Sequence, residues 1–454
     1  MKICIVGAGI SGLATAQALL ARRPDAELLV FESSQRIGGK VWTEMTPEGY
    51  LCEGGVNGFL SKEPKTLELC EQIGLAPVAA DDAAKKRFVY SEQQLHKLPE
   101  KPPEFLTSHL LSVRGRLRVM YEMFVRGGGN PDETLAEFGT RRLGSEAFAK
   151  LIDPMASGVF AGNAEKLSVK SCFPRIKEVE AEYGSLIRGL IKLQMKARRE
   201  GKKDTPGPGP AGTLTSFGGG MGEMTDTLAS QLGSRIRTES PVASISRHAE
   251  RFTLHLENGA DEDTDFLILA VPAYAQARIL NDMAPDIARL LSEIEYPPLS
   301  VVCTGYRCNT LDTQPEGFGF LVPSKEQRAI LGTVVDSNVF PGRAPQDAVL
   351  LRSMVGGARS PQLALLPDDK LMDAVCGELK KILGIRTDPD FVRIYRHEKA
   401  IPQYNIGHAA RLDAIEQAVG LYPGLVLTGN AFRGVSLNDC IVNAGKAAGH
   451  FSGD

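Results

Sequence analysis

The chain has 454 residues, of which 43% are hydrophobic and 24% are charged, a composition typical of a globular protein with about two or three domains. Its formal net charge of -3 excludes a global attraction to nucleic acid, so we expect no nucleic-acid partner. The eight cysteines form no C-x-x-C pair and the seven histidines have no metal-ligand spacing, so no metal site is predicted. No apolar stretch reaches the length of about 18 residues that a membrane-spanning helix needs.

The first segment has the order of strand, glycine-rich loop and helix that a dinucleotide-binding fold requires. Residues 2–6 (KICIV) are β-formers, and residues 13–23 (LATAQALLARR) have helical spacing. The loop between them, GAGISG, places a tight turn and bare backbone at the positive end of the helix, where a pyrophosphate binds. A second strand, AELLVFE, ends twenty residues beyond the last of these glycines in an acid suited to both ribose hydroxyls. The predicted nucleotide-binding residues here are Gly7, Gly9, Ile10, Ser11, Gly12, Glu32 and Ser33.

The stretch that follows the acid extends beyond what a nicotinamide cofactor needs. A cation and a glycine pair in SQRIGGK predict the longer cofactor FAD. The sequence here resembles the flavin oxidases of the amine oxidase and protoporphyrinogen oxidase superfamily, in which the acid is followed by R-x-G-G and an acid-x-G turn. Glu53 begins the match to that turn, and a lysine replaces the arginine of many members. The resemblance adds Arg36, Gly38, Gly39, Lys40, Gly54 and Gly55 to the FAD site.

The chain contains a second strand, turn and helix near its other end, in residues 427–449 (LTGNAFRGVSLNDCIVNAGKAAG). In the superfamily that it resembles, this unit lies under the flavin. Glycine ends the strand, asparagine opens the turn, and the start of the next helix presents backbone amides that stabilise negative charge on the ring. The resemblance therefore assigns to the FAD site Val242, whose backbone would meet the adenine, and Gly429, Asn430, Val435, Ser436 and Leu437.

Within the superfamily, the chain is most similar to the protoporphyrinogen oxidase family over essentially its whole length. Stretches that carry this resemblance include AKKRFVY (84–90), LIDPMASGVFAG (151–162) and MVGGARSPQLA (354–364). The family's substrate is a flexible tetrapyrrole with propionates on one edge, which needs an apolar slot and a cation at its rim. The resemblance implies that Arg87 pairs with a propionate, Gly158 lies beside the ring, Leu321 and Val334 enclose it, and Met354 stands where plant members have phenylalanine.

Without the resemblance, these residues have simpler explanations: Arg87 follows two lysines as on a solvated face, and the apolar positions are ordinary strand residues of a core. The resemblance implies hydride transfer from a methylene bridge to flavin N5, with reoxidation by dioxygen; a quinone is the alternative acceptor. No side chain is assigned as a catalytic base. The chemistry is largely that of the cofactor, with the protein providing orientation and a dry site.

Sequence patterns typical of β-strands become rare between about residues 95 and 200. Residues 102–129 combine leucines, methionines and Phe124 with four arginines, the pattern of a basic amphipathic segment; packing against the protein's own core is the alternative. The family uses such an insertion to lie on a membrane, so we expect peripheral attachment at a cytoplasmic membrane face, with some of the protein in solution, and a homodimer. The Pro- and Gly-rich residues 199–213 predict a flexible surface linker.

The predicted fold class is α/β, with a Rossmann-type FAD domain in residues 1–90, 213–272 and 400–454, a helical membrane-associating insertion in 91–212, and a mixed α+β substrate domain in 273–399. The predicted function is oxidation of protoporphyrinogen IX to protoporphyrin IX in haem synthesis. Coproporphyrinogen III oxidation is the near alternative, which would need more rim cations. An amine oxidase-like enzyme is more distant, because 6% aromatic residues and one tryptophan supply a poor aromatic cage. A flavin-binding protein without turnover also stays open.

Overall fold

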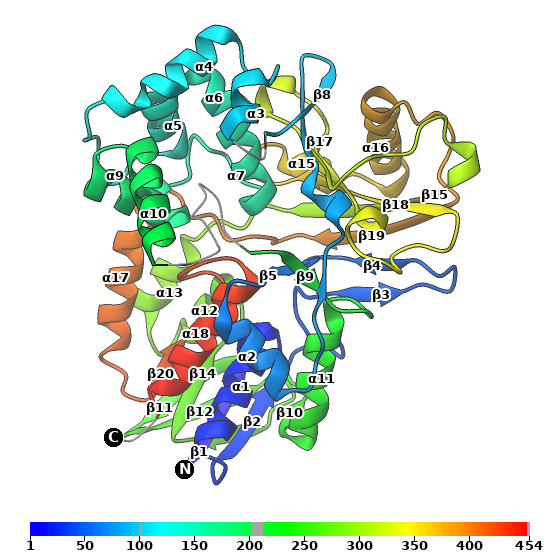
Figure 1. Cartoon of the computed structure of the whole chain (residues 1–454). Coiled ribbons are helices and arrows are strands. Elements are labelled where there is room, and N and C mark those ends of the chain that lie inside the picture. The colour runs from blue at the N-terminus through cyan, green and yellow to red at the C-terminus, as the bar shows by residue number, and fades with distance from the viewer. Residues whose placement is uncertain (100–101, 201–211, 452–454) are drawn as a thin grey trace.

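A computed structural model describes residues 1–99, 102–200 and 212–451. It has three regions (Figure 1): a parallel sheet at the base, which holds the N-terminus, a larger sheet at the upper right, and a group of helices at the upper left.

The base sheet is parallel throughout, and its strands come from separated segments of the chain. Its order is β10 (Ile236–Arg237), β2 (Glu27–Phe31), β1 (Lys2–Val6), β14 (Phe266–Leu269) and β20 (Leu425–Leu427). Ile3 and Ile5 of β1 point to one face and Cys4 and Val6 to the other, as a period of two requires, and all four are buried. A strand buried on both faces is typical of a sheet with helices packed on each side.

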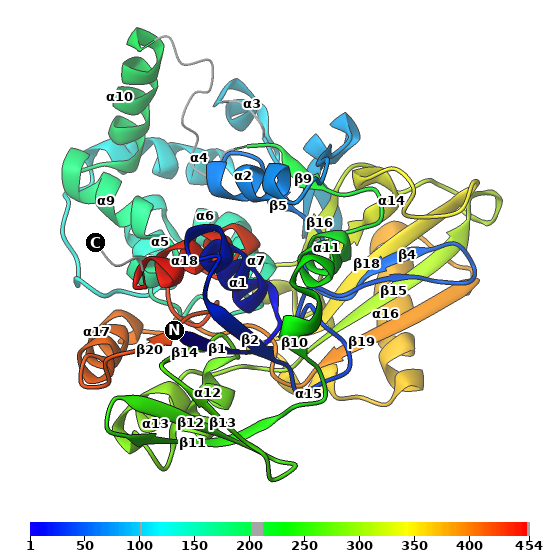
Figure 2. The same ribbon diagram turned by 90° about the horizontal axis from the view of Figure 1, so that it is seen from below.

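Each face of the base sheet has its own cover (Figures 1 and 2). One face packs against the helices α1 (Ile10–Arg22), α2 (Pro64–Gln72), α11 (Gly222–Leu232) and α18 (Leu437–Gly449). The opposite face packs against the antiparallel strands β11 (Val242–His248), β12 (Arg251–Leu256) and β13 (Asp261–Thr264) and the helices α12 (Ala273–Leu280), α13 (Pro285–Ser292) and α17 (His408–Val419).

The upper-right sheet has seven strands. Their order is β19 (Phe391–His397), β15 (Leu299–Arg307), β18 (Ala348–Gly356), β17 (Ile330–Val335), β16 (Gly319–Leu321), β7 (Arg87–Ser91) and β8 (Gln94–Lys97). On one face lies α16 (Asp368–Leu383), whose Leu371, Val375 and Leu379 are fully buried against the sheet. The short helices α14 (Asp336–Val339) and α15 (Pro361–Ala364) lie in its connections.

The first predicted domain boundary, at residue 90, falls inside a strand of this second sheet. β7 pairs in parallel with β16 and antiparallel with β8, so residues 87–97 belong to the seven-stranded sheet. The pairing of β7 with β16 joins residues more than 200 positions apart, and a single-sequence pattern does not show which distant strand is the partner. Two small sheets, β3 (Thr43–Met45) with β4 (Leu51–Glu53), and β9 (Leu214–Ser216) with β5 (Phe59–Leu60) and β6 (Val78–Ala79), complete the strands.

The upper-left region is helical, as the sequence predicts for residues 95 to 200. Its helices are α3 (Pro102–Thr107), α4 (Val113–Met120), α5 (Leu135–Leu143), α6 (Ser145–Ala147), α7 (Asp153–Phe160), α8 (Val169–Cys172), α9 (Pro174–Tyr183) and α10 (Leu186–Arg199). No helix in the described ranges is long and apolar enough to span a membrane. Residues 201–211 of the predicted linker lie outside the described residues.

Candidate functional site: a flavin cradle beside an apolar sheet face

The loop between β1 and α1 has two kinds of glycine. A Cβ atom built at Gly12 would lie 1.9 Å from the carbonyl oxygen of Gly7, so Gly12 is needed for packing of helix on strand. Gly9 has an ordinary φ of -76°, and a Cβ built there would meet nothing nearer than the Cα of Gly39, at 3.8 Å. An alanine would therefore fit at position 9 in the protein alone. The bare backbone of Gly9 at the start of α1 fits the close approach of a pyrophosphate such as that of FAD.

The R-x-G-G segment lies against this loop. The N–H of Gly38 donates to the carbonyl of Ala8 at 2.9 Å, and Gly39 adopts a φ of +59°, which favours glycine. The Arg36 guanidinium stacks 4.5 Å from the centroid of Trp42 and donates to the carbonyl of Val41 at 3.2 Å. The loop therefore closes one side of the cradle.

Glu32 ends β2 next to the phosphate loop. Its Oε2 accepts a hydrogen bond from the N–H of Ala8 at 2.9 Å, and its Oε1 accepts from the N–H of Ser34 at 3.0 Å and from the hydroxyl of Ser33 at 3.2 Å. The carboxylate is partly exposed, which leaves lone pairs for ribose hydroxyls. The carbonyl of Glu32 accepts from the N–H of Ser240, which brings the chain before the buried Val242 alongside.

The C-terminal turn follows β20. Gly429 has a φ of +125°, which excludes most other residues, and Ser436 caps α18 in a reciprocal pair with Asp439. One expectation needs correction here: the N–H of Ser436 donates to Oδ2 of Asp439 at 3.1 Å, because the capping box uses it, so it is not presented to a ligand. Val435 is partly buried, and Leu437 is buried where α18 begins.

Lys40 lies deeper than a surface lysine. Its ammonium donates to the carbonyl of Ala400 and lies 5.0 Å from the centroid of the Tyr296 ring. Burial lowers the pKa of Lys40 to about 8. Gly55 packs on it so closely that a Cβ built there would lie 2.1 Å from the Lys40 carbonyl oxygen. The acid-Gly-Gly turn and the R-x-G-G loop are thus held together.

The acid of that turn, Glu53, is only 1% exposed. It accepts hydrogen bonds from the hydroxyl of Thr43 at 2.5 Å and from the N–H of Met221 at 2.8 Å, and Arg343 lies 3.8 Å away. Burial raises the pKa of Glu53 to about 7. In the sequence, Glu53 is recognisable only as a motif position. Its structural role, tying β4 to the start of α11, depends on contacts that lie far apart in the chain.

We expect stability to depend on Glu53 with a definite sign. The folded state holds the proton up to about pH 7 and the unfolded state releases it near 4.5, so the free energy of unfolding falls as pH rises between these values. Glu53→Gln retains an acceptor oxygen and should remove this fall, which amounts to at most about 3 kcal/mol. Urea titrations of both proteins at pH 5 and at neutral pH measure it; equal pH slopes would contradict the assignment.

The predicted substrate residues come together on the face of the seven-stranded sheet opposite α16. One row across the sheet pairs Arg87 with Gly319, Gly319 with Val334 and Val334 with Arg352. The next row on this face pairs Leu321 with Gly332 and Gly332 with Met354. Gly158, on α7, approaches the same face: a Cβ built there would lie 2.9 Å from Cδ2 of Leu321.

Arg87 differs from its basic neighbours. Arg352 pairs with Asp336 at 2.8 Å, Arg359 with Asp153 at 3.4 Å, and Lys86 with Glu316 at 3.4 Å. Arg87 is exposed and forms no ion pair with any described residue; its guanidinium lies 5.3 Å from the centroid of the Phe318 ring. Arg87 is therefore a cation available to a ligand at the edge of an apolar face. Arg352 and Phe318 were missed by sequence analysis, although Arg352 precedes Met354 by two residues and so shares its face.

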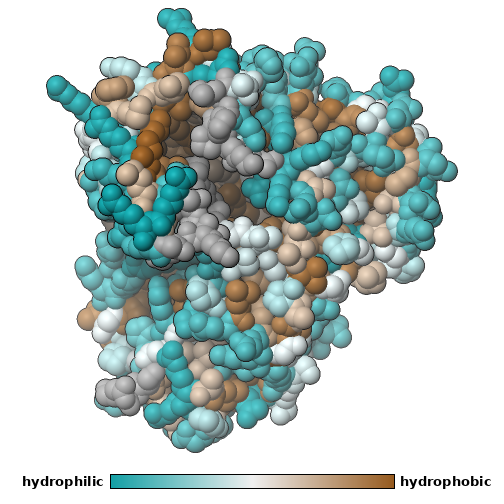
Figure 3. Space-filling model, in the orientation of Figure 1, coloured by the Kyte–Doolittle hydropathy of each residue, from teal (hydrophilic) through white to brown (hydrophobic). Residues whose placement is uncertain are grey.

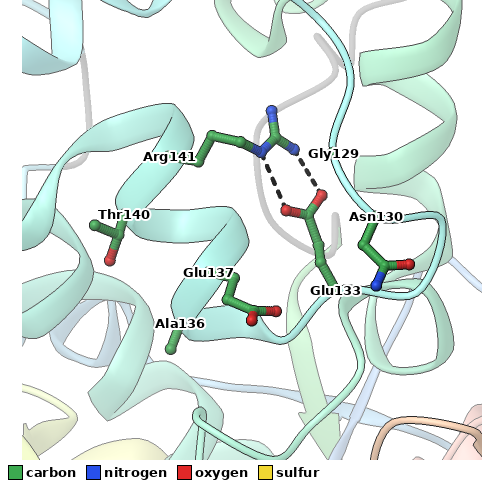
Figure 4. A pocket seen from close by; sticks show the side chains of 7 residues that line it. All are labelled: Gly129, Asn130, Glu133, Ala136, Glu137, Thr140 and Arg141. Atoms are coloured by element: carbon green, nitrogen blue, oxygen red, sulfur yellow. Dashed lines mark hydrogen bonds and ion pairs between the residues drawn. The ribbon is translucent and has the colours of Figure 1, made fainter.

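A groove in the helical region is a poorer candidate. Figure 4 shows its lining residues, Gly129, Asn130, Glu133, Ala136, Glu137, Thr140 and Arg141. Glu133 binds Arg141 through two contacts and Lys177 at 2.9 Å, and Glu137 caps α5 with Thr134. Its charges are satisfied within the protein. In the part of the chain that the structure describes, no cluster of three or more His, Cys, Asp or Glu side chains could hold a metal.

Residues 10–450 match the family described as flavin containing amine oxidoreductase. The chain belongs to this family. As a member of this family it is an FAD-dependent oxidoreductase, and the bare backbone at Gly9 and the ribose acid Glu32 fit that cofactor.

Named relatives cover nearly the whole chain. It is 34% identical to the chloroplastic protoporphyrinogen oxidase of Oryza sativa subsp. japonica, over 99% of this chain and 87% of the relative. It is 29% identical to the coproporphyrinogen III oxidase of Bacillus subtilis, over 98% of this chain and 96% of the relative. The crystal structure of a provisionally named protoporphyrinogen oxidase from Exiguobacterium sp. 255-15 is 27% identical and superposes with a TM-score of 0.83, over 99% and 98% of the two chains. Both family resemblances that the sequence suggested are confirmed.

Proposed function

We propose that this flavoenzyme oxidises protoporphyrinogen IX to protoporphyrin IX in haem synthesis, with dioxygen as the electron acceptor. The observation that carries the substrate assignment is Arg87, an exposed arginine that forms no ion pair with any described residue, at the edge of an apolar face built from Leu321, Val334 and Met354. A macrocycle with carboxylates on one edge matches that arrangement. Relatives named as protoporphyrinogen oxidases support the proposal.

The roles of the chain's own residues follow from their places. FAD, when bound, supplies the hydride acceptor. Arg87 binds a propionate and fixes which edge of the macrocycle faces outward. The apolar rows on the sheet bind the ring and exclude water, which strengthens the electrostatic interactions nearby. No described carboxylate or imidazole is assigned as a base.

Coproporphyrinogen III is the second candidate substrate, because Arg87 is the last of three consecutive cations. Lys85 and Lys86 are exposed; Lys85 pairs with the exposed Asp82 at 2.5 Å, and Lys86 pairs with the exposed Glu316 at 3.4 Å. An exposed ion pair contributes little free energy. A carboxylate on a second edge of the substrate could therefore replace Glu316 as the partner of Lys86.

An aerobic assay of the purified yellow protein separates the two candidates. Protoporphyrinogen IX and coproporphyrinogen III are supplied in parallel, and the fluorescence of the porphyrin formed is followed. We expect a higher kcat/KM with protoporphyrinogen IX. A higher value with coproporphyrinogen III would transfer the assignment to the second candidate, and turnover of neither would exclude both.

We also propose that the helical region binds the cytoplasmic face of a membrane. Its apolar side chains are unusually exposed: Leu117 is 61% and Phe124 65% exposed, and Val113, Met120, Tyr121, Ile191 and Met195 are exposed as well. Figure 3 shows hydrophobic side chains at the top and upper left, where Figure 1 places α4 and α10. Arg114, Lys192 and Lys196 lie among them and would attract anionic lipids. α10 lies within residues 91–212, the predicted membrane-associating insertion, although its apolar side chains were not singled out from the sequence.

The double variant Leu117→Asp/Phe124→Asp should weaken binding to vesicles that contain anionic lipid by about tenfold or more, because two apolar side chains are lost from the contact. Sedimentation with phosphatidylcholine/phosphatidylserine vesicles measures it. Leu421→Asp, at a leucine outside the helical region that is 75% exposed, is the control and should bind as the unaltered protein does. Equal sedimentation of all three proteins would contradict the proposal.

A further inference from the structure

A stacked pair of buried rings lies behind the C-terminal flavin turn. Tyr404 and His408 are each 1% exposed, and their ring centroids lie 4.1 Å apart at an interplanar angle of 14°. The Tyr404 hydroxyl donates to the carbonyl of Asn430 at 2.6 Å, and Nε2–H of His408 donates to the carbonyl of Phe432 at 3.3 Å. The two acceptor carbonyls therefore lie two residues apart in the same turn.

These two bonds determine the direction of the neighbouring amides. In a trans peptide the C=O of one residue and the N–H of the next point in opposite directions. The N–H groups of Ala431 and Arg433 are therefore turned away from the stacked pair. Ala431 is 1% exposed, yet its N–H donates to none of the described residues. A buried N–H without a partner is costly, and a bound ligand is one way to satisfy it.

The same pair is fixed to the helical region. The carbonyl of Tyr404 accepts from the N–H of Ser168 at 2.8 Å, and the N–H of Gly407, which precedes α17, donates to Oδ2 of Asp132 at 2.8 Å. Ser168 and Asp132 both belong to the helical region, and they are joined to each other by a hydrogen bond. Tyr404 and His408 thus connect that region to the flavin turn.

We propose that Tyr404 and His408 are positioning residues for the flavin: they hold the carbonyls of Asn430 and Phe432 so that the N–H groups of Ala431 and Arg433 remain free for FAD. The inference rests on the FAD site and not on the identity of the substrate. Of the two neutral tautomers of His408, only the one with the proton on Nε2 donates to Phe432; its Nδ1 has no partner among the described residues.

The test compares Tyr404→Phe with Tyr422→Phe. Each removes one phenolic hydrogen bond to a backbone carbonyl, of Asn430 in the first case and of Met283 in the control, at 3.1 Å. FAD release from the diluted holoprotein is followed by flavin fluorescence, and the midpoint potential of the bound flavin is measured. We expect Tyr404→Phe to raise the FAD dissociation constant by about five- to tenfold and to shift the potential.

His408→Phe keeps the stacked ring, removes the second donor and should act in the same direction. Tyr422→Phe should leave both values unchanged. Unchanged flavin affinity and potential in both Tyr404→Phe and His408→Phe, or an equal change in the control, would overturn the inference. Because neither readout uses a porphyrinogen, failure here is distinct from failure of the proposed substrate.

Discussion

Gly9→Ala should give a folded protein that binds its flavin much more weakly. The φ of -76° suits alanine, and the new Cβ would meet nothing nearer than 3.8 Å in the protein, so the free energy of unfolding of the apoprotein should hardly change. The methyl group would occupy the space that a pyrophosphate needs at the start of α1. Overpacking of this kind costs about 1–3 kcal/mol or more, so FAD should bind about 10- to 100-fold more weakly. Flavin fluorescence titration and thermal melts of the apoprotein measure the two quantities.

Two further glycines control this experiment. A Cβ at Gly377, in the middle of α16, would meet nothing within 4 Å, so Gly377→Ala should retain FAD and gain slightly in stability. Gly12→Ala should instead lose stability, since its Cβ would lie 1.9 Å from a backbone oxygen. If Gly9→Ala binds FAD as tightly as Gly377→Ala does, the phosphates do not lie at this loop.

Arg87→Ala should raise the KM for protoporphyrinogen IX by about 10- to 100-fold, as expected for loss of a charge-assisted hydrogen bond to a carboxylate. Flavin content should be unchanged, because Arg87 lies on β7 of the second sheet, and among the described residues its guanidinium contacts the Phe318 ring and no residue of the flavin cradle. Since the bond is made equally in the ground state and the transition state, kcat should change little. Steady-state kinetics on the flavin-loaded protein give both values.

Arg87→Lys and Lys86→Ala test whether the rise in KM comes from loss of the Arg87 guanidinium. Lysine keeps the charge without the planar fork, so it should recover only part of the affinity. Lys86 already pairs with Glu316 at 3.4 Å, so Lys86→Ala should leave the KM for protoporphyrinogen IX almost unchanged. An unchanged KM in Arg87→Ala would remove Arg87 from the site.

The nucleotide end of the fold could be predicted because its signals are local. The β-formers of residues 2–6, the loop glycines and Glu32 lie within one β-α-β unit, where spacing alone indicates the chemistry. The return of residues 266–269 to the same sheet was also predictable as an apolar run. The pairing of β7 with β16 was not predictable, because pairing between strands over 200 residues apart leaves no local pattern.

The substrate side depended on resemblance to a family, and the structure adds what that could not give. By pattern, Leu321, Val334 and Met354 are core residues, and only the strand register places them on one face with Arg87. Among the described residues, Arg87 has no carboxylate partner, whereas the neighbouring Arg352 and Arg359 each have one. This difference cannot be predicted from the sequence, because it depends on side chains that lie far apart in the chain. The roles of Tyr404 and His408 could not be predicted either, because they depend on hydrogen bonds that only the tertiary fold brings together.

Anaerobic mixing of the flavin-loaded protein with protoporphyrinogen IX is the most direct test of the central claim. We expect the yellow absorbance of the bound flavin to bleach as the porphyrinogen is consumed, and to return when air is admitted. Coproporphyrinogen III and a simple primary amine, mixed in the same way, should bleach it more slowly or not at all. A flavin that stays yellow with both porphyrinogens but bleaches with the amine would contradict the proposed function.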